Sequence, residues 1–229
     1  MHRIGYAEPM LLETIIEIRD DTPHSAALNM ALDEVLLADA IAPLLRIYRW
    51  ERPAVSFGYF GKFAPLAAAW PGREIVRRMT GGGVVPHGED LTYSLIVPIC
   101  HAFAARNPRD VYRAVHETIG ALLAGDGEAP SLSAPPEREG SGVCFESPAE
   151  FDLLAGAEKI AGAAMRRTRD GLLLQGSIQS LPALESLRHR LVSAFSANVI
   201  AAVFTPRQIT AGEALATEKY ATREWTARV

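Results

Sequence analysis

The chain turns at Arg77-Arg78-Met79-Thr80-Gly81-Gly82-Gly83-Val84-Val85-Pro86-His87-Gly88, where three consecutive glycines join a β-rich segment to another apolar run. Glycine has no Cβ, so this backbone can adopt positive φ, approach a ligand closely and present its N–H groups. Arg77 and Arg78 stand just before the glycines, and the planar donor fork of arginine suits carboxylate or phosphate. The pattern favours an acyl or phosphoryl pocket. The alternative is a glycine-rich hairpin with two solvated arginines.

A second motif follows downstream, with Cys144-Phe145-Glu146-Ser147-Pro148 ahead of Glu158-Lys159-Ile160-Ala161-Gly162-Ala163-Ala164. A cysteine thiolate exchanges one thioester for another when a neighbouring base or positive charge lowers the thiol pKa. Lys159 opens a Gly/Ala-rich strand without another charge until Arg166, and burial there would lower the pKa of the lysine. Cys144 and Lys159 are therefore the candidate catalytic pair. Taken singly, they are also compatible with a small buried hydrophobe and a solvated lysine.

Five segments in order resemble the biotin/lipoate protein ligase superfamily. They are Asn29-Met30-Ala31-Leu32-Asp33-Glu34, Leu45-Arg46-Ile47-Tyr48-Arg49-Trp50, the arginine–glycine turn, the Lys-Ile-Ala-Gly segment at 159–162, and Gly171-Leu172-Leu173-Leu174-Gln175-Gly176-Ser177-Ile178. Cys-Phe-x-x-Pro before the lysine and Leu-Gln-Gly-Ser-Ile after it are most similar to the cysteine-dependent octanoyltransferases. The resemblance implies an α+β fold of the class II aminoacyl-tRNA synthetase/biotin–lipoate ligase type, with mixed or antiparallel sheets flanked by helices.

The resemblance also implies a reaction. Cys144 takes an octanoyl or lipoyl group as a thioester from an acyl carrier protein or an acylated H protein. Lys159 then assists the target lysine of a lipoyl domain or glycine-cleavage H protein as that amine attacks the acyl-enzyme. This transferase needs no cofactor.

Nine residues are expected to bind the acyl substrate: Arg77, Arg78, Thr80, Gly81, Gly82, Gly83, His87, Gly162 and Ala163. Backbone N–H groups of Gly162 and Ala163, or of the glycine turn, would hold the developing oxyanion. His87 either touches the acyl carbonyl or caps its polar loop. No metal site is expected, because the six histidines and two cysteines lack ligand spacing.

Two other functions stay open. An ATP-dependent lipoate–protein ligase would use the glycine turn and Lys159 to bind an acyl-adenylate, with ATP and Mg²⁺ as cofactors. Three departures argue against a ligase. The usual Asn-Asp pair is replaced by Phe151-Asp152, and the usual His-Asp-x-Gly-Asn pattern is replaced by His87-Gly88-Glu89-Asp90-Leu91. A chain ending at Val229 also leaves no room for an accessory domain. A non-catalytic acyl- or carrier-binding module would lose the nucleophile, so Cys144 together with Lys159 argues against it.

The amino-acid composition constrains the class of protein only broadly. The 229 residues are 48% hydrophobic and 22% charged, which is typical of a globular protein with a substantial core. A net charge of −4 argues against a nucleic-acid partner. With no apolar run long enough for a membrane helix and no secretory signal, the expected location is the cytoplasm. We expect a single catalytic domain over 1–229, with 183–229 as a C-terminal helical segment.

Periodicity predicts the elements around these motifs. Helices are expected after Ser25, from Asp110 to about 124, over 183–195, and over 206–218 after Thr205-Pro206. Strands are expected at 12–19, 44–50, 54–59, 74–79, 91–97, 151–154, 159–167 and 172–178. The last three should form an antiparallel set, and 126–143 should be a loop ending at Cys144.

Overall fold

The computed structural model describes residues 10–124, 130–135, 148–179 and 184–228. Cys144 and the rest of its motif up to Ser147 lie outside the described residues. The strands are β1 (Thr14–Arg19), β2 (Leu44–Tyr48), β3 (Ala54–Phe57), β4 (Glu74–Arg77), β5 (Val84–His87), β6 (Leu91–Pro98), β7 (Pro130–Leu132), β8 (Leu153–Ala155), β9 (Glu158–Arg167), β10 (Gly171–Ile178) and β11 (Asn198–Ala202). The helices are α1 (Ala26–Asp39), α2 (Phe63–Ala69), η1 (Ala102–Ala105), α3 (Pro108–Ala124), α4 (Leu184–Phe195), α5 (Pro206–Leu215), the π-helical turn η2 (Ala216–Tyr220) and α6 (Arg223–Thr226).

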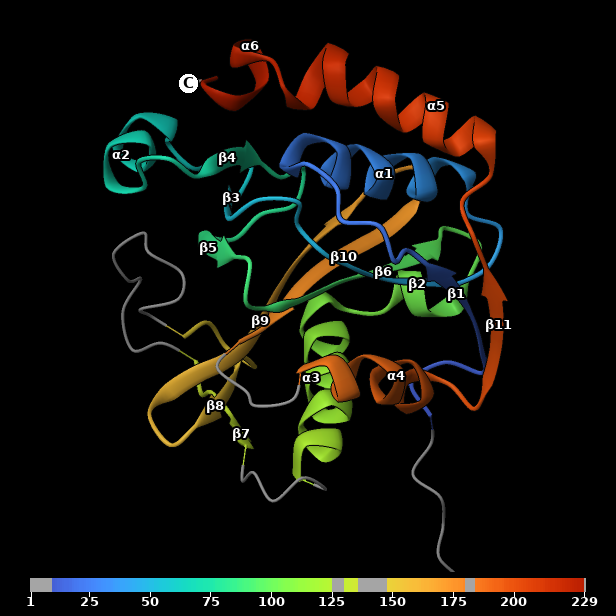
Figure 1. The fold of residues 1–229 in the computed structure, drawn as a ribbon. Coiled ribbons are helices and arrows are strands. Elements are labelled where there is room, and N and C mark those ends of the chain that lie inside the picture. The colour runs from blue at the N-terminus through green and yellow to red at the C-terminus, as the bar shows by residue number, and fades with distance from the viewer. Residues whose placement is uncertain (1–9, 125–129, 136–147, 180–183, 229) are drawn as a thin grey trace, which may run out of the picture.

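Two sheets organise the described residues. The larger has eight strands in the order β11-β1-β2-β6-β10-β9-β8-β7, and the smaller has three in the order β4-β3-β5. β1 pairs in parallel with both β11 and β2, whereas β2–β6–β10–β9–β8–β7 are antiparallel neighbours. The predicted α+β fold with mixed sheets flanked by helices is confirmed (Figure 1). The predicted antiparallel pairing of the strands β8, β9 and β10 is confirmed as well.

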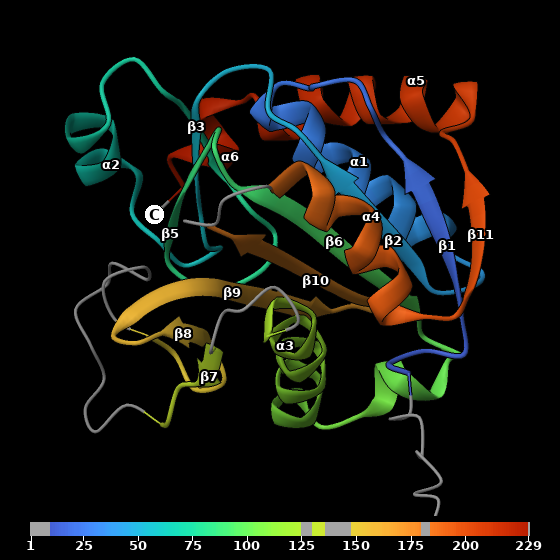
Figure 2. The same cartoon turned by 60° about the horizontal axis from the view of Figure 1, so that its bottom comes forward.

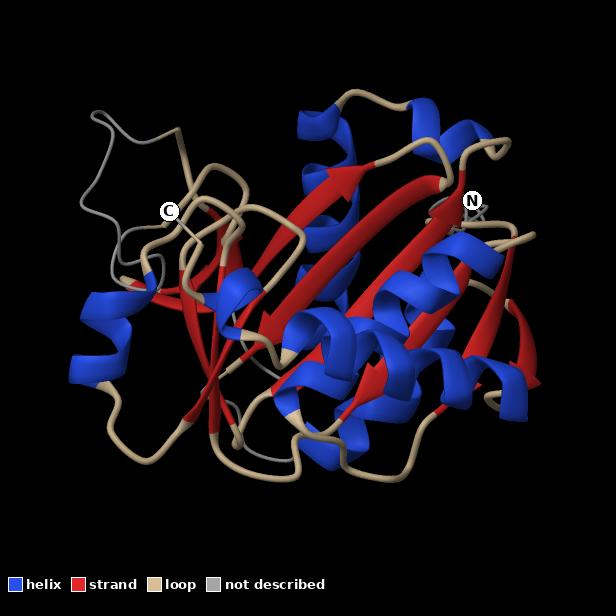
Figure 3. Ribbon diagram, turned by 90° about the horizontal axis from the view of Figure 1, so that it is seen from above, coloured by secondary structure: helices blue, strands red, loops and turns tan. Residues whose placement is uncertain are grey.

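Helices cover both faces of the large sheet, and the pleat explains why. Leu172 and Leu174 of β10 join the core formed with α3 and α4, while Leu173 between them packs with Leu36 and Leu37 of α1. Successive side chains of a strand point to opposite faces, so an uninterrupted apolar strand must be buried on both. Figures 1 and 3 show α1 and α5 on one face, and Figures 1 and 2 show α3 and α4 on the other.

Local signals place two helix starts where the sequence predicts them. The Ser25 hydroxyl accepts a hydrogen bond from the Leu28 N–H at 3.3 Å and caps α1. Thr205 and Gln208 form a reciprocal capping box at the start of α5, with Pro206 at the first helical position. A cap satisfies backbone donors that the helix itself leaves open, so it works through nearest neighbours in sequence.

The C-terminal part differs from the expected helical segment, because β11 lies between α4 and α5. Asn198–Ala201 are exposed, so no burial pattern marks them as a strand. They form β11 because their backbone pairs in parallel with β1, for example Val199 with Ile15. α2 was also not predicted, and His87, expected in a loop, is the last residue of β5.

His116 of α3 supplies a test of this packing. Burial lowers its pKa to about 4, and the positive charge of Lys159 contributes in the same direction. Between about pH 6.5 and pH 4 the unfolded chain therefore binds a proton that the folded chain does not, so stability falls as the pH drops through this window, by up to about 3 kcal/mol.

The difference in unfolding free energy between pH 7.5 and pH 4.5, measured with urea, should shrink in His116→Leu. Carboxylates also titrate in this range, so only the difference between wild type and variant reports on His116. Replacing the exposed His189 by alanine should leave the pH dependence unchanged. An equal pH dependence in wild type and His116→Leu would contradict the assignment.

Candidate active site

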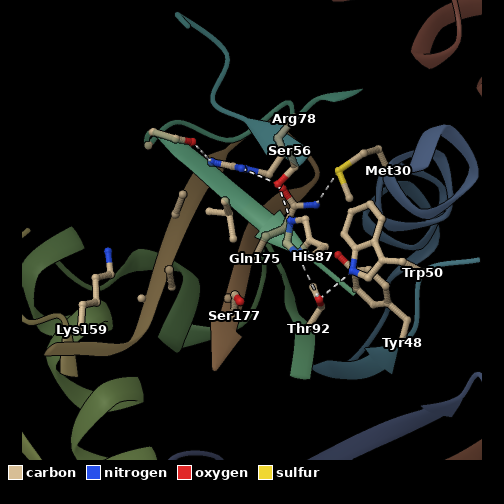
Figure 4. A pocket seen from close by; sticks show the side chains of 17 residues that line it. Met30, Tyr48, Trp50, Ser56, Arg78, His87, Thr92, Lys159, Gln175 and Ser177 are labelled. Carbon is tan, nitrogen blue, oxygen red and sulfur yellow. Dashed lines mark hydrogen bonds between the residues drawn. The ribbon is translucent and has the colours of Figure 1, made fainter. Parts of the chain in front are cut away.

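A narrow pocket, here called the slot, lies between the β9–β10 hairpin, the glycine turn and α1 (Figure 4). Its lining consists of Met30, Tyr48, Trp50, Ser56, Arg78, Gly82, Gly83, Val85, His87, Thr92, Lys159, Gly162, Ala163, Ala164, Gln175, Gly176 and Ser177. Its volume of about 40 Å³ is enough for a few water molecules. Glycine and alanine make up much of the wall, so a thin unbranched ligand could lie against nearly bare backbone.

Arg78 holds the glycine turn in place. Its Nη2 donates to the carbonyl oxygens of Gly81 at 3.0 Å and Gly83 at 2.9 Å, and its Nη1 donates to Ser56 Oγ at 2.6 Å. Gly82 between them has φ of +81°, a conformation that side chains with a Cβ rarely adopt. The three glycines therefore form a turn tied to a buried cation.

Arg77 points elsewhere and does not line the slot. Its guanidinium donates to the carbonyl oxygens of Tyr59, Gly61, Trp225, Thr226 and Arg228. Neighbouring residues of an extended chain face opposite sides, so only one of two consecutive arginines can reach the slot. We assign Arg77 to anchoring the C-terminal turns.

Lys159 forms a buried ion pair at one end of the slot. Its Nζ lies 2.7 Å from Asp152 Oδ2, and the two side chains are only 5% and 4% exposed. Burial raises the pKa of Asp152, and the opposing effect of Lys159 does not cancel the increase. The Ala149 N–H also donates to Asp152 Oδ2 at 2.6 Å and fixes the carboxylate.

Gly162 is required by this ion pair. A Cβ at this position would come within 2.5 Å of Lys159 Cε, 2.7 Å of its Nζ and 2.8 Å of Asp152 Oδ1. These approaches are shorter than van der Waals contact allows. The glycine of Lys-Ile-Ala-Gly therefore makes room for the lysine that opens the same motif.

Phe151, next to Asp152, has φ of +70°, the only non-glycine residue with positive φ among those described. Its ring lies under the guanidinium groups of Arg109 and Arg113, at 5.6 and 5.3 Å. Asparagine adopts this conformation more readily than phenylalanine does. The Asn-Asp pattern expected of ligases would thus fit the same backbone.

A buried charged network lies behind Gln175, which lines the slot. Asp33 of α1 accepts hydrogen bonds from Arg46 Nη1 at 2.7 Å, from Ser94 Oγ at 2.5 Å and from Gln175 Nε2 at 2.7 Å. The Thr80 hydroxyl donates to Gln175 Oε1 at 2.7 Å, so both ends of that amide are occupied. The network links α1 to the residue that opens the glycine turn.

The slot brings together seven of the predicted site residues: Arg78, Gly82, Gly83, His87, Lys159, Gly162 and Ala163. Arg77, Thr80 and Gly81 lie outside its lining, and Thr80 contributes only through Gln175. Sequence reasoning missed Trp50, Gln175 and Ser177 as lining residues. Gln175 and Ser177 belong to the Leu-Gln-Gly-Ser-Ile segment, whose polar residues inside an apolar strand were the available signal.

Three general features complete the description. Within the described ranges, no group of three or more His, Cys, Asp or Glu side chains is placed to hold a metal ion. None of the helices that the structure describes is both long and apolar enough to cross a membrane. Cys100 is an exposed free thiol.

The fold and the slot agree with the match of residues 25–220 to the lipoyl protein ligase A/B catalytic domain, and the chain belongs to this family. Among solved structures, lipoate-protein ligase A bound with ATP superposes with a TM-score of 0.73 at 21% identity, covering 94% of this chain and 99% of that one. A bi-partite lipoate protein ligase from Thermoplasma acidophilum gives 0.72 at 20% identity, covering 94% and 96%. At these identities the likeness shows the fold.

Curated relatives are more specific. Octanoyltransferase LipM of Oceanobacillus iheyensis is 39% identical over 168 residues, which cover 69% of this chain and 62% of the relative. Octanoyltransferase LipM of Carboxydothermus hydrogenoformans is 36% identical over 170 residues, covering 69% and 62%. The matches thus span about 62% of the length of these relatives.

Proposed function

We propose that this chain transfers an octanoyl group from a carrier thioester to a lysine of a lipoyl domain or H protein, through a thioester on Cys144. The observation that carries the proposal is the buried cation of Lys159 at the end of a slot walled by glycine and alanine. The relatives named octanoyltransferase support the acyl group and the reaction class. Cytoplasmic location belongs to the same proposal.

Each residue has a chemical role in this proposal. Cys144 attacks the incoming thioester and keeps the acyl group as a thioester of similar energy. The Lys159 ammonium, positioned by Asp152, stabilises negative charge that develops near the reacting carbonyl. Backbone N–H groups of Gly162 and Ala163, or of Gly82 and Gly83, supply further donors.

Intact-mass spectrometry tests the proposal. Mixed with octanoyl acyl carrier protein, the wild type should gain one octanoyl mass without ATP and pass it to a lipoyl domain. Cys144→Ser should gain none. Two outcomes would contradict the proposal: acylation that requires ATP and releases pyrophosphate, which marks a ligase using ATP and Mg²⁺, and binding of the carrier without any acyl gain, which marks a binding module.

A further inference from the structure

One face of the molecule carries an excess of arginine, although the whole chain is acidic. Residues 99–113 and 163–170 together contain six arginines and two aspartates, a net charge of +4, whereas the net charge of the chain is −4. Five of these arginines are exposed and are here called the arginine face: Arg106, Arg109, Arg113, Arg167 and Arg169. A local field of this sign attracts an acidic partner even when the molecule as a whole is negative.

The arginine face lies where α3 packs beside β9 (Figures 1 and 2). The Met165 N–H of β9 donates to the Tyr112 hydroxyl of α3 at 2.9 Å. The Arg167 guanidinium donates to the carbonyl oxygen of Arg106, just before α3 begins. These hydrogen bonds join the two segments, so their arginines form one continuous surface.

Aromatic rings hold three of these side chains in place. The Arg106 guanidinium lies over the Phe103 ring at 4.8 Å. Arg109 and Arg113 lie over the Phe151 ring at 5.6 and 5.3 Å. A guanidinium that stacks on a ring still directs its in-plane N–H donors outward, where they suit carboxylates. Side chains that are already ordered also lose less entropy when a partner binds.

Carboxylates of the chain balance only part of this charge. Among the described residues, no carboxylate forms an ion pair with Arg106 or Arg167. The other three arginines have carboxylate partners, namely Arg109 with Glu150, Arg113 with Asp110, and Arg169 with Asp170. Exposed ion pairs of this kind are weak, so the carboxylates of a partner can replace them.

One end of the arginine face adjoins the ion pair of the slot. Phe151, whose ring lies under Arg109 and Arg113, directly precedes Asp152. The Asp152 carboxylate lies 2.7 Å from Lys159 Nζ. A partner bound over this ring is therefore close to the end of the slot where Lys159 stands.

The edge of β9 beside the face is open over much of its length. β8 pairs with β9 only as far as Ala161, and no other strand that the structure describes joins this edge. Gly162, Ala163 and Ala164 of β9 line the slot, and Arg167 follows three residues later. The arginine face thus borders the strand that forms one wall of the slot.

The chemistry of the two protein substrates decides which of them fits this face. An acceptor domain presents a lysine ammonium, which the arginines repel. A donor carrier presents its thioester on an arm that is attached through an anionic phosphodiester, and acidic residues around that attachment would meet the arginines with opposite charge. The arginine face therefore fits the donor better than the acceptor.

We propose that the arginine face is the docking surface for the acyl donor, a carrier domain with an acidic surface around its phosphodiester arm; this rests on the proposed function. Carboxylates of the carrier bind the arginines, and the arm passes over the open edge of β9 to the Lys159 end of the slot. Attraction between opposite charges raises the rate of encounter, and salt screens it.

Octanoyl loading, followed by intact mass, is compared for three donors: octanoyl acyl carrier protein, octanoyl phosphopantetheine without protein, and octanoyl pantetheine without protein or phosphate. The reversed variant combines Arg113→Glu with Arg167→Glu. With the carrier protein at low salt, its kcat/KM should fall by roughly 10-fold or more, mainly through KM, and the loss should shrink at about 0.5 M NaCl. With both protein-free donors it should load as wild type does.

The control variant combines Arg19→Glu with Arg207→Glu, which changes the net charge equally. Arg19 is on β1, separated from β9 by β2, β6 and β10, and Arg207 is on α5, across the sheet from α3 (Figures 1 and 3). It should load as wild type does with all three donors. Both variants should unfold at the wild-type urea concentration, because all four side chains are exposed. A carrier with two acidic residues beside its arm changed to lysine should load the reversed variant faster than the unmodified carrier does.

Four results would overturn the docking surface. An equal loss with octanoyl pantetheine would show that the arginines act on the active site itself, and a full loss with octanoyl phosphopantetheine would show that they bind only phosphate. An equal loss in the control variant would show an effect of net charge alone. A loss confined to transfer to the lipoyl domain would assign the face to the acceptor. A wild type that loads octanoate from none of the three donors would instead overturn the proposed function.

Discussion

Lys159→Ala is expected to reduce octanoyl transfer by roughly 10³-fold, because it removes the cation at the end of the slot. It should also destabilise the fold by about 3–5 kcal/mol, since Asp152 would remain as an uncompensated buried carboxylate. The ion pair of 2.7 Å with side chains only 5% and 4% exposed is the reason for both effects. Transfer is measured by intact mass and stability by urea unfolding at pH 7.5.

A double variant separates these two losses. Lys159→Met with Asp152→Asn removes both charges and keeps an acceptor for the Ala149 N–H, which donates to Asp152 at 2.6 Å. Replacing both partners by neutral groups of similar size is often close to neutral for stability. The double variant should therefore unfold near the wild-type urea concentration and still fail to transfer. Recovery of transfer in it would show that Lys159 acts only through stability.

Arg46→Met is expected to have the largest effect on stability, about 5 kcal/mol, which is comparable with the whole stability of a small domain. Arg46 is 0% exposed and lies 2.7 Å from Asp20 and 2.7 Å from Asp33. Its loss would leave two buried carboxylates without their cation. Circular dichroism and urea unfolding should show a variant that is largely unfolded, or unfolds at much lower urea.

The pH dependence of this variant has a definite sign. Burial alone would raise the pKa of Asp20, but His24 and Arg46 hold it below its ordinary value. A depressed carboxyl pKa contributes stability above the unfolded pKa and loses it as the pH falls through the folded pKa. Without Arg46 the pKa of Asp20 should rise towards or above its unfolded value, so Arg46→Met should lose less stability on acidification than wild type does.

An exposed arginine supplies the control for Arg46. The Arg19 guanidinium lies 3.4 Å from Glu17 and its side chain is 61% exposed, so Arg19→Ala should change stability by less than about 1 kcal/mol. A similar small change in Arg46→Met would contradict the account of the buried network. The loss of stability in Arg46→Lys should lie between the losses in Arg46→Met and Arg19→Ala, because lysine keeps the charge but not the planar fork that reaches both aspartates.

The elements that could be predicted from the sequence are those stabilised by interactions between residues close together along the chain. The caps at Ser25 and Thr205 are satisfied within one helical turn, and the Asp170-Gly171 turn joins β9 to β10 where Thr168 N–H donates to the Gly171 carbonyl at 2.8 Å. β11 shows the opposite case: its residues are exposed, and only the edge of the large sheet makes them a strand.

The sequence by itself determined the helices α1, α3, α4 and α5, the antiparallel hairpin of β9 and β10, and the glycine and lysine segments from which the slot is built, because these depend on spacing along the chain. Only the tertiary structure decided which of Arg77 and Arg78 reaches the slot, that Asp152 holds Lys159, and that Ser56, His87 and Asp90 form one hydrogen-bonded chain. Arg78 meets Ser56 and Ser56 meets His87 across 22 and 31 positions of sequence, and the Lys159–Asp152 pair spans the turn between β8 and β9. Their partners are fixed by sheet register and by burial, which no local pattern encodes.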